Sequence, residues 1–88
     1  MAELPHRTTF ALDYGDERRA RVVKTSVARE VGEIDDDRSQ TSLLRDGPTV
    51  EVVVEAADLV ALRAACNTWL SLVGVAEETA GAAETVPF

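Results

Sequence analysis

The fold is decided by residues 46–78, which read DGPTVEVVVEAADLVALRAACNTWLSLVGVAEE. The Asp-Gly pair at their start is a strong hairpin signal, because both central positions of a type I′ turn need a positive φ. Residues 49–56 then alternate valine with glutamate over most of their length, as a strand does when it buries one side. Asp58 is a candidate N-cap. A long helix is expected to follow, from Leu59 to about Glu78.

This long helix carries two apolar seams, each with a 4-3-4-3 spacing. The first seam consists of Leu62, Cys66, Trp69, Val73 and Ala76, with Leu59 and Leu70 beside it. The second seam consists of Ala61, Ala65, Thr68, Leu72 and Val75, with Val60 and Ala64 beside it. Together they cover well over half of the circumference, whereas a surface helix normally shows an apolar arc of about 100°. We therefore expect the first seam to pack on a sheet and the second to bind another protein. The alternative is that the other helix of this chain fills part of the second seam.

The N-terminal half of the chain predicts three further elements. A strand is expected over His6–Tyr14, where β-branched and aromatic residues alternate with others. Asp16 is a candidate N-cap for a helix that runs to about Val31 and ends at Gly32, which suits a C′ position. A short acidic loop then leads into a strand over Ser39–Arg45.

The order β-α-β-β-α predicts an α+β fold. A right-handed crossover makes the first two strands parallel and leaves the third between them, antiparallel to both. The expected sheet is three-stranded with order 1-3-2, and both helices cover one face. We assign residues 1–78 to the domain and 79–88 to a flexible tail. Two open sheet edges favour a homodimer with a continuous six-stranded sheet.

Length and composition restrict the class of protein. With 88 residues the chain holds one domain, and its small core buries only about 60–65% of the unfolded surface. No apolar run is expected to approach the roughly 18 residues of a membrane span, so we expect a soluble chain, and we expect no signal peptide. A single cysteine, Cys66, forms neither an internal disulfide nor a Cys-based zinc site. We expect a cytoplasmic protein with no membrane partner.

The charge balance is strongly acidic. Sixteen Asp and Glu face nine basic residues, and Lys24 is the only lysine among those nine. Carboxylates hold water and cations, and molar salt screens their repulsion to within about 3 Å. This pattern favours an origin in a halophilic archaeon. An ordinary acidic protein from a high-GC genome is the alternative.

Catalysis is not indicated. His6 is the only histidine, and it is expected on the surface. Cys66 falls on a seam that we expect to be buried, so a Cys–His pair is not favoured. The run Asp35-Asp36-Asp37 predicts a solvated loop. The glycines are scattered and form no phosphate-binding loop. We expect no enzyme, no cofactor and no metal.

Residues 50–73 resemble the small subunit of the KEOPS complex, the Pcc family. That family shows a valine-rich strand, an Asp-Leu opening and a helical motif. The motif is matched here by Leu62, Arg63, Ala64, Ala65, Asn67, Thr68, Trp69 and Leu70. The order of the elements also agrees, so the resemblance covers nearly the whole chain. Cys66 departs from the larger apolar residue that the family more often has, and a buried thiol fits there.

The resemblance implies a non-catalytic subunit. KEOPS makes threonylcarbamoyl-adenosine next to the anticodon of tRNA, and its chemistry belongs to a catalytic subunit of the sugar-kinase/actin-like fold. A kinase-like ATPase joins that subunit. The resemblance implies that the small subunit forms a homodimer, binds the catalytic subunit through its helices and assists tRNA binding. The candidate partner-binding residues are then Ala61, Ala64, Ala65, Thr68, Leu72 and Val75.

A basic stripe on the first helix is a candidate contact for tRNA phosphates. Arg18, Arg21 and Arg29 fall within one arc, on the side opposite the apolar residues. The alternative is a solvated face whose arginines pair with Asp16, Glu17 and Glu30. Two other classes of function stay open: a stand-alone RNA-binding module of KH type, and an unrelated homodimeric regulatory protein.

Overall fold

The structure of the chain, a computed structural model, describes residues 4–31 and 37–84, with side chains as far as residue 78. Its elements are β1 (His6–Asp13), α1 (Glu17–Ala28), β2 (Ser39–Asp46), β3 (Thr49–Ala56) and α3 (Leu59–Glu84). The predicted order β-α-β-β-α is confirmed.

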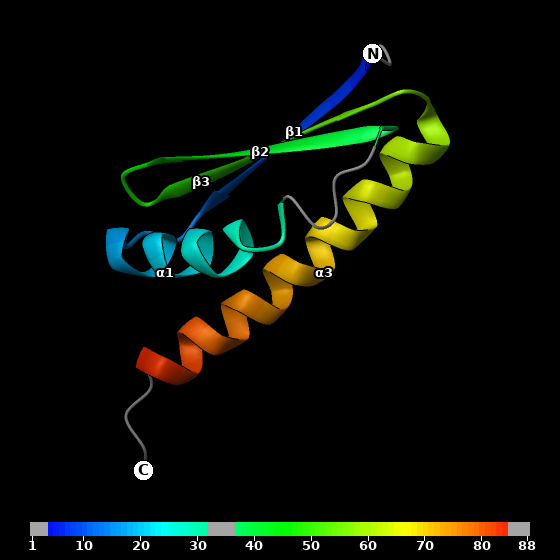
Figure 1. Cartoon of the computed structure of the whole chain (residues 1–88). Coiled ribbons are helices and arrows are strands. Elements are labelled where there is room, and N and C mark those ends of the chain that lie inside the picture. The colour runs from blue at the N-terminus through cyan, green and yellow to red at the C-terminus, as the bar shows by residue number, and fades with distance from the viewer. Residues whose placement is uncertain (1–3, 32–36, 85–88) are drawn as a thin grey trace.

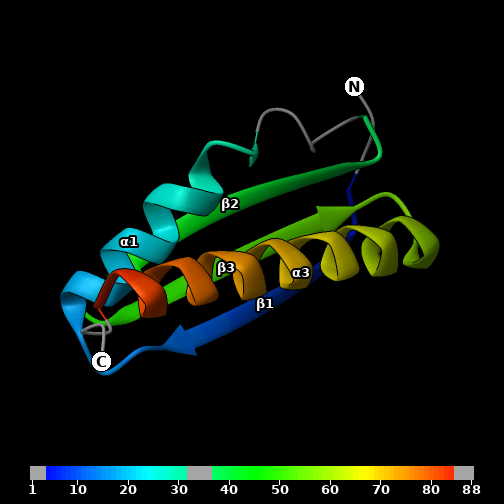
Figure 2. The same ribbon diagram turned by 90° about the horizontal axis from the view of Figure 1, so that it is seen from below.

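The three strands form one antiparallel sheet with β3 in the centre and the order β1-β3-β2. The register places Phe10 and Leu43 on either side of Val52. Both helices lie on the same face of this sheet (Figure 1). Seen from that face, α1 lies over β2, whereas α3 runs along the length of the sheet (Figure 2). The predicted fold class, strand order and helix placement are therefore confirmed.

The hairpin between β2 and β3 differs from the predicted turn. Asp46 pairs with Thr49, so Gly47 and Pro48 are the two central residues of the turn. Gly47 has a φ of 59°, and the only described residues with positive φ are glycines. One positive φ, at the first central position, is the pattern of a type II′ turn. The prediction of a type I′ turn centred on Asp46-Gly47 was wrong, because Asp46 stays in the strand.

Helix α1 begins as predicted and ends earlier. The Asp16 carboxylate accepts a hydrogen bond from the Arg18 backbone N–H at 2.9 Å, which confirms the N-cap. The helix ends at Ala28 rather than about Val31. The Glu30 N–H bonds to the Val27 carbonyl at 3.0 Å, and this i→i−3 pattern tightens the last turn. The predicted C′ residue, Gly32, lies outside the described residues.

Helix α3 continues beyond the predicted end. It runs to Glu84 instead of about Glu78, so the backbone of the segment 79–84 is helical. Three alanines in that segment favour a helix and offset the single Gly81. Residues 85–88 lie outside the described part. The domain boundary at residue 78 stays a prediction.

The core lies between the sheet and the two helices. Trp69 of α3 is fully buried, and its indole N–H has no hydrogen-bond partner among the described residues. Valines from β3 and α1 surround the same core, namely Val23, Val27, Val50, Val52 and Val54. At the far end of the core, the Tyr14 hydroxyl donates a hydrogen bond of 2.8 Å to Glu77. Burial, followed by this bond to a carboxylate, raises the pKa of Tyr14. The bond joins the segment after β1 to α3.

Candidate protein-docking surface on α3

The start of α3 is held against Arg38, the residue just before β2. The Asp58 carboxylate accepts a hydrogen bond of 2.8 Å from the Ala61 N–H and pairs with the Arg38 guanidinium. These two contacts, the backbone bond first, hold the pKa of Asp58 below its usual range. The Ala57 N–H also bonds to the Arg38 carbonyl at 2.9 Å. Asp58 was predicted as the N-cap, whereas its contact with Arg38 had no signal in the sequence.

One side of α3 packs on the sheet, where the first seam was expected. Trp69, Val73 and Ala76 are buried, and Leu62 and Cys66 are partly buried against the same core. Burial raises the pKa of the Cys66 thiol, which disfavours the thiolate, the reactive form of cysteine. This side of the helix is therefore structural.

The second seam is divided by the tertiary structure. Ala65 is only 6% exposed and belongs to the core of this chain, so it is not available to a partner. Ala61 is partly buried, and Leu72 packs against the core. Ala64, Thr68 and Val75 remain exposed. Only part of the predicted partner-binding set therefore faces outward.

Two hollows border the second seam. The smaller, of about 170 Å³, lies between the helices and is lined by Ser26, Val27, Glu30, Leu72, Val75 and Ala76. The larger, of about 300 Å³, lies between α3 and the start of β2 and is lined by Arg38, Ser39, Val60, Ala61, Ala64, Ala65 and Thr68. No residue of α1 lines the larger hollow, and α1 has 12 residues whereas α3 has 26. The other helix of this chain thus covers one end of the seam and leaves the other end open.

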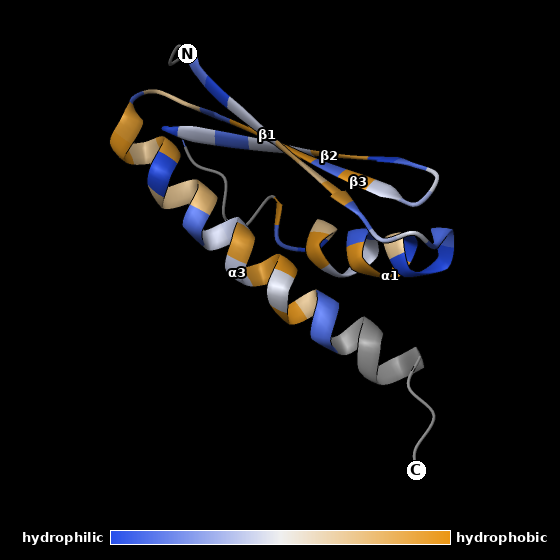
Figure 3. Ribbon diagram, turned by 180° about the vertical axis from the view of Figure 1, so that it is seen from behind, coloured by the Kyte–Doolittle hydropathy of each residue, from blue (hydrophilic) through white to orange (hydrophobic). Residues whose placement is uncertain are grey.

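The side of α3 that faces away from the sheet is exposed and mostly apolar. We call it the outer face of α3 and define it by Leu59, Val60, Arg63, Ala64, Asn67, Thr68, Leu70, Ser71 and Val75. Its large apolar members are 63% (Leu59), 78% (Val60), 46% (Leu70) and 61% (Val75) exposed. Figure 3 shows apolar colouring along much of α3, in contrast to the hydrophilic start of α1. A soluble monomer rarely leaves a contiguous apolar patch uncovered without a function for it.

The hydroxyl groups on the outer face are occupied by the helix itself. Thr68 donates to the Ala64 carbonyl and Ser71 donates to the Asn67 carbonyl, each at 3.0 Å. Their hydrogen atoms therefore point back to the helix backbone. The outer face is consequently less polar than its sequence suggests, and Arg63 and Asn67 are its main polar groups.

A comparison with known families addresses the resemblance. The family model described as "Transcription factor Pcc1" matches residues 7–81. The chain belongs to the Pcc1 family. This is a family of non-catalytic accessory subunits of KEOPS, so the resemblance of residues 50–73 is confirmed at the level of the family. No curated protein matches the chain.

The length of α3 also bears on membrane binding. The stretch Leu59–Glu78 of this Pcc1 family member is long and apolar enough to cross a membrane, by length and composition alone. The core helix of a soluble protein passes the same test, and here the Trp69 side packs on the sheet. About 28% of the apolar stretch is buried within the chain. The absence of a membrane partner stays a prediction.

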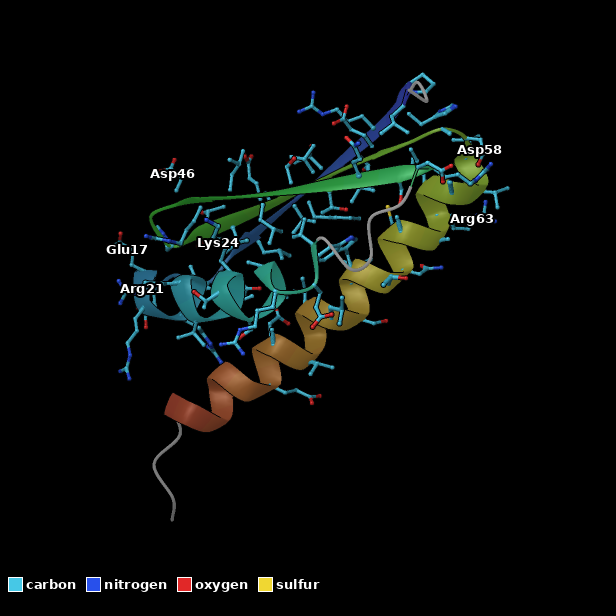
Figure 4. All side chains as sticks on the ribbon, in the orientation of Figure 1. Glu17, Arg21, Lys24, Asp46, Asp58 and Arg63 are labelled. Carbon is cyan, nitrogen blue, oxygen red and sulfur yellow. The ribbon has the colours of Figure 1, made fainter. Side chains whose placement is uncertain are left out.

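The basic stripe of α1 is exposed to solvent. Arg18, Arg21 and Arg29 are exposed, and no ion pair joins them to another described residue. The alternative pairing of these arginines with Asp16, Glu17 and Glu30 is not seen among the described residues, and Glu17 pairs with Arg45 instead, at 3.3 Å. Arg29 is the C-cap residue, just past the last helical residue, with helical dihedral angles. Figure 4 shows Arg21 on α1, far from Arg63 on α3.

The remaining candidate groups lie apart. His6 begins β1 and Cys66 lies in the middle of α3, where it faces the core. Within residues 4–31 and 37–78, no three His, Cys, Asp or Glu side chains come close enough to hold a metal ion. Asp35 and Asp36 lie outside the described residues, and Asp37 is exposed.

Proposed function

We propose that this chain is the KEOPS subunit that binds the threonylcarbamoyltransferase catalytic subunit and joins two copies of the complex. It acts in the cytoplasm and assists tRNA binding while threonylcarbamoyl-adenosine is formed next to the anticodon. The kinase-like ATPase is reached indirectly, through the catalytic subunit. The exposed outer face of α3 is the observation that carries this proposal.

The charge distribution on α3 supports a protein partner. The chain has 16 acidic residues, yet none of them falls between Asp58 and Glu77. Carboxylates are therefore missing from the outer face of α3, where Leu59, Val60, Leu70 and Val75 are exposed. The cores of protein interfaces show this composition, with apolar groups, few acidic residues and an occasional arginine.

Mixing purified proteins tests the proposal directly. The chain and the KEOPS catalytic subunit should co-elute from a size-exclusion column, at an earlier volume than either protein alone. If the two proteins elute separately at micromolar concentration, in both low and molar salt, the proposed function is wrong.

The isolated chain is expected to be a homodimer. Both β1 and β2 are edge strands of the sheet, and an unpaired edge is a template for pairing with a second copy. Edge pairing would give a six-stranded sheet and leave both helices of each copy free for the catalytic subunit. Light scattering in molar salt, which screens the carboxylates, should give the mass of two chains. A monomer mass at micromolar concentration would contradict this expectation.

The arginines of α1 are expected to contribute to tRNA binding only. Changing Arg18, Arg21 and Arg29 together to alanine should lower the affinity of the assembled complex for tRNA. The slope of log affinity against log salt should flatten by up to about 0.9 for each phosphate that the arginines no longer neutralise. Binding to the catalytic subunit should not change, because these side chains belong to α1. Unchanged tRNA affinity and slope would show that the stripe is a solvated face.

The KH-type alternative is not favoured by the structure. A KH module clamps the nucleic-acid backbone with a Gly-x-x-Gly loop. The closest candidate pair here, Gly74 and Gly81, lies within α3. Helical residues do not provide such a loop.

A further inference from the structure

One basic side chain lies alone in the outer face of α3. Arg63 is exposed and is the only charged residue between Asp58 and Glu77. No ion pair joins it to any residue that the structure describes. The positions three and four residues away, where an intrahelical partner would stand, are occupied by Leu59, Val60, Cys66 and Asn67. Arg63 therefore contributes no ion pair to the stability of its own helix.

We propose that Arg63 is the specificity-determining residue of the outer face of α3, and that the protein surface covering this face presents a carboxylate to it. This inference rests on the proposed function, because it concerns the same surface. It adds the chemistry of the partner: an apolar surface with an acidic side chain opposite the second turn of α3.

Burial explains why a carboxylate is required. Leu59, Val60 and Leu70 are exposed around Arg63, so a partner that covers these apolar side chains also removes water from the guanidinium. A buried charge without a partner opposes binding strongly. A carboxylate is the matching group, because it accepts two parallel hydrogen bonds from the guanidinium fork. The nearby Asn67 amide is exposed and can bond to the same acidic group.

The surroundings favour a carboxylate of a protein over a phosphate of RNA. Phosphate contacts are made by basic and small polar groups at a hydrated surface. Around Arg63 the exposed neighbours are mainly apolar, with Asn67 as the one polar side chain three or four residues away that is exposed, and no second basic residue lies on α3. The multiple arginines that could bind an RNA backbone are on α1 instead.

The test uses four variants of the full chain: Arg63→Met, Arg63→Glu, Arg63→Lys and the control Arg21→Glu. Arg21 is also exposed and unpaired among the described residues, and it lies far from Arg63 (Figure 4). Affinity for the KEOPS catalytic subunit is measured by titration calorimetry, and affinity for tRNA is measured in parallel. Circular dichroism checks that each variant folds.

Arg63→Met should bind the catalytic subunit at least about 30-fold more weakly, and Arg63→Glu should lose still more. Arg63→Lys should fall between wild type and Arg63→Met, because it keeps the charge and loses the fork. Arg21→Glu should bind the catalytic subunit like wild type and should weaken only tRNA binding, because Arg21 belongs to the basic stripe of α1. Changing one acidic residue of the catalytic subunit to lysine should restore the binding of that subunit to the Arg63→Glu variant.

The outcomes separate the inference from the proposed function. If wild type binds and Arg63→Met binds equally well, the inference is wrong and the proposed function stands. If Arg63→Met weakens tRNA binding alone, the group opposite Arg63 is a phosphate and the inference is wrong. If wild type itself does not bind the catalytic subunit, both are wrong.

Discussion

Replacing Trp69 with alanine is expected to lower the free energy of unfolding by about 3–5 kcal/mol. Trp69 is fully buried between α3 and the sheet, and truncating such a side chain costs about 3–5 kcal/mol. A domain of 88 residues has a total stability of about 4–13 kcal/mol, at the usual 0.05–0.15 kcal/mol per residue. The change therefore removes a large share of the stability. Urea and thermal unfolding followed by circular dichroism measure the effect.

A control in the same helix separates core packing from helix formation. Val60 is 78% exposed, so Val60→Ala should change the free energy of unfolding by no more than about 0.5 kcal/mol. If Trp69→Ala lowers the unfolding free energy by less than about 1 kcal/mol, a cost far below that of truncating a buried tryptophan, the described position of Trp69 in the core is wrong.

The second large effect is expected on assembly. Ala64→Glu should weaken binding to the catalytic subunit at least about 100-fold, because a charge buried without a partner costs several kcal/mol. Ala64 is exposed and glutamate is a good helix former, so the free protein should fold as wild type does. Calorimetric titration of the catalytic subunit measures the loss.

A charge-matched control lies on the opposite face of the sheet. Leu44 is 55% exposed on β2, opposite Glu51 of β3. Because that face is not covered by the helices, Leu44→Glu should leave binding to the catalytic subunit unchanged. If Ala64→Glu binds as tightly as wild type, the open part of the second seam is not the interface.

The choice of Ala64 follows from the structure and not from the seam pattern. From the sequence pattern alone, Leu72 is a large apolar member of the second seam, and a charge introduced there would be the obvious test of an interface. The structure packs Leu72 against the core and beside α1. A charge at that position would destabilise the chain itself, so a loss of binding would not identify an interface.

The sequence by itself determined the elements whose signals are local. Alternation from Thr49 to Ala56, bounded by a turn and an N-cap, predicted β3 at its observed limits. Asp16 caps α1 because its side-chain oxygen reaches the N–H of Arg18 within the same turn. The sheet order followed from the handedness of the crossover, which is a general property of L-amino acids. The family motif from Leu62 to Leu70 lies within one helix and was likewise readable.

Only the tertiary structure decided which surfaces remain free. Periodicity gives the angle of a side chain around a helix, but not the neighbour that lies at that angle. Ala65 and Ala64 are adjacent in sequence, yet the first is buried in the core and the second is exposed. Val53 is 7% exposed on the face that the helices leave open, because strands flank it on both sides, with Thr9 and Ser42 opposite.

The same limit applies to the ends of elements and to contacts between them. Three features depend on where distant segments meet. They are the end of α1 at Ala28, the type II′ turn at Gly47 and the hydrogen bond from Tyr14 to Glu77. The short α1 and the long α3 leave part of the second seam uncovered. Because α1 is too short to lie along all of α3, the packing of the two helices, and not the periodicity of α3, decides which of its residues stay exposed.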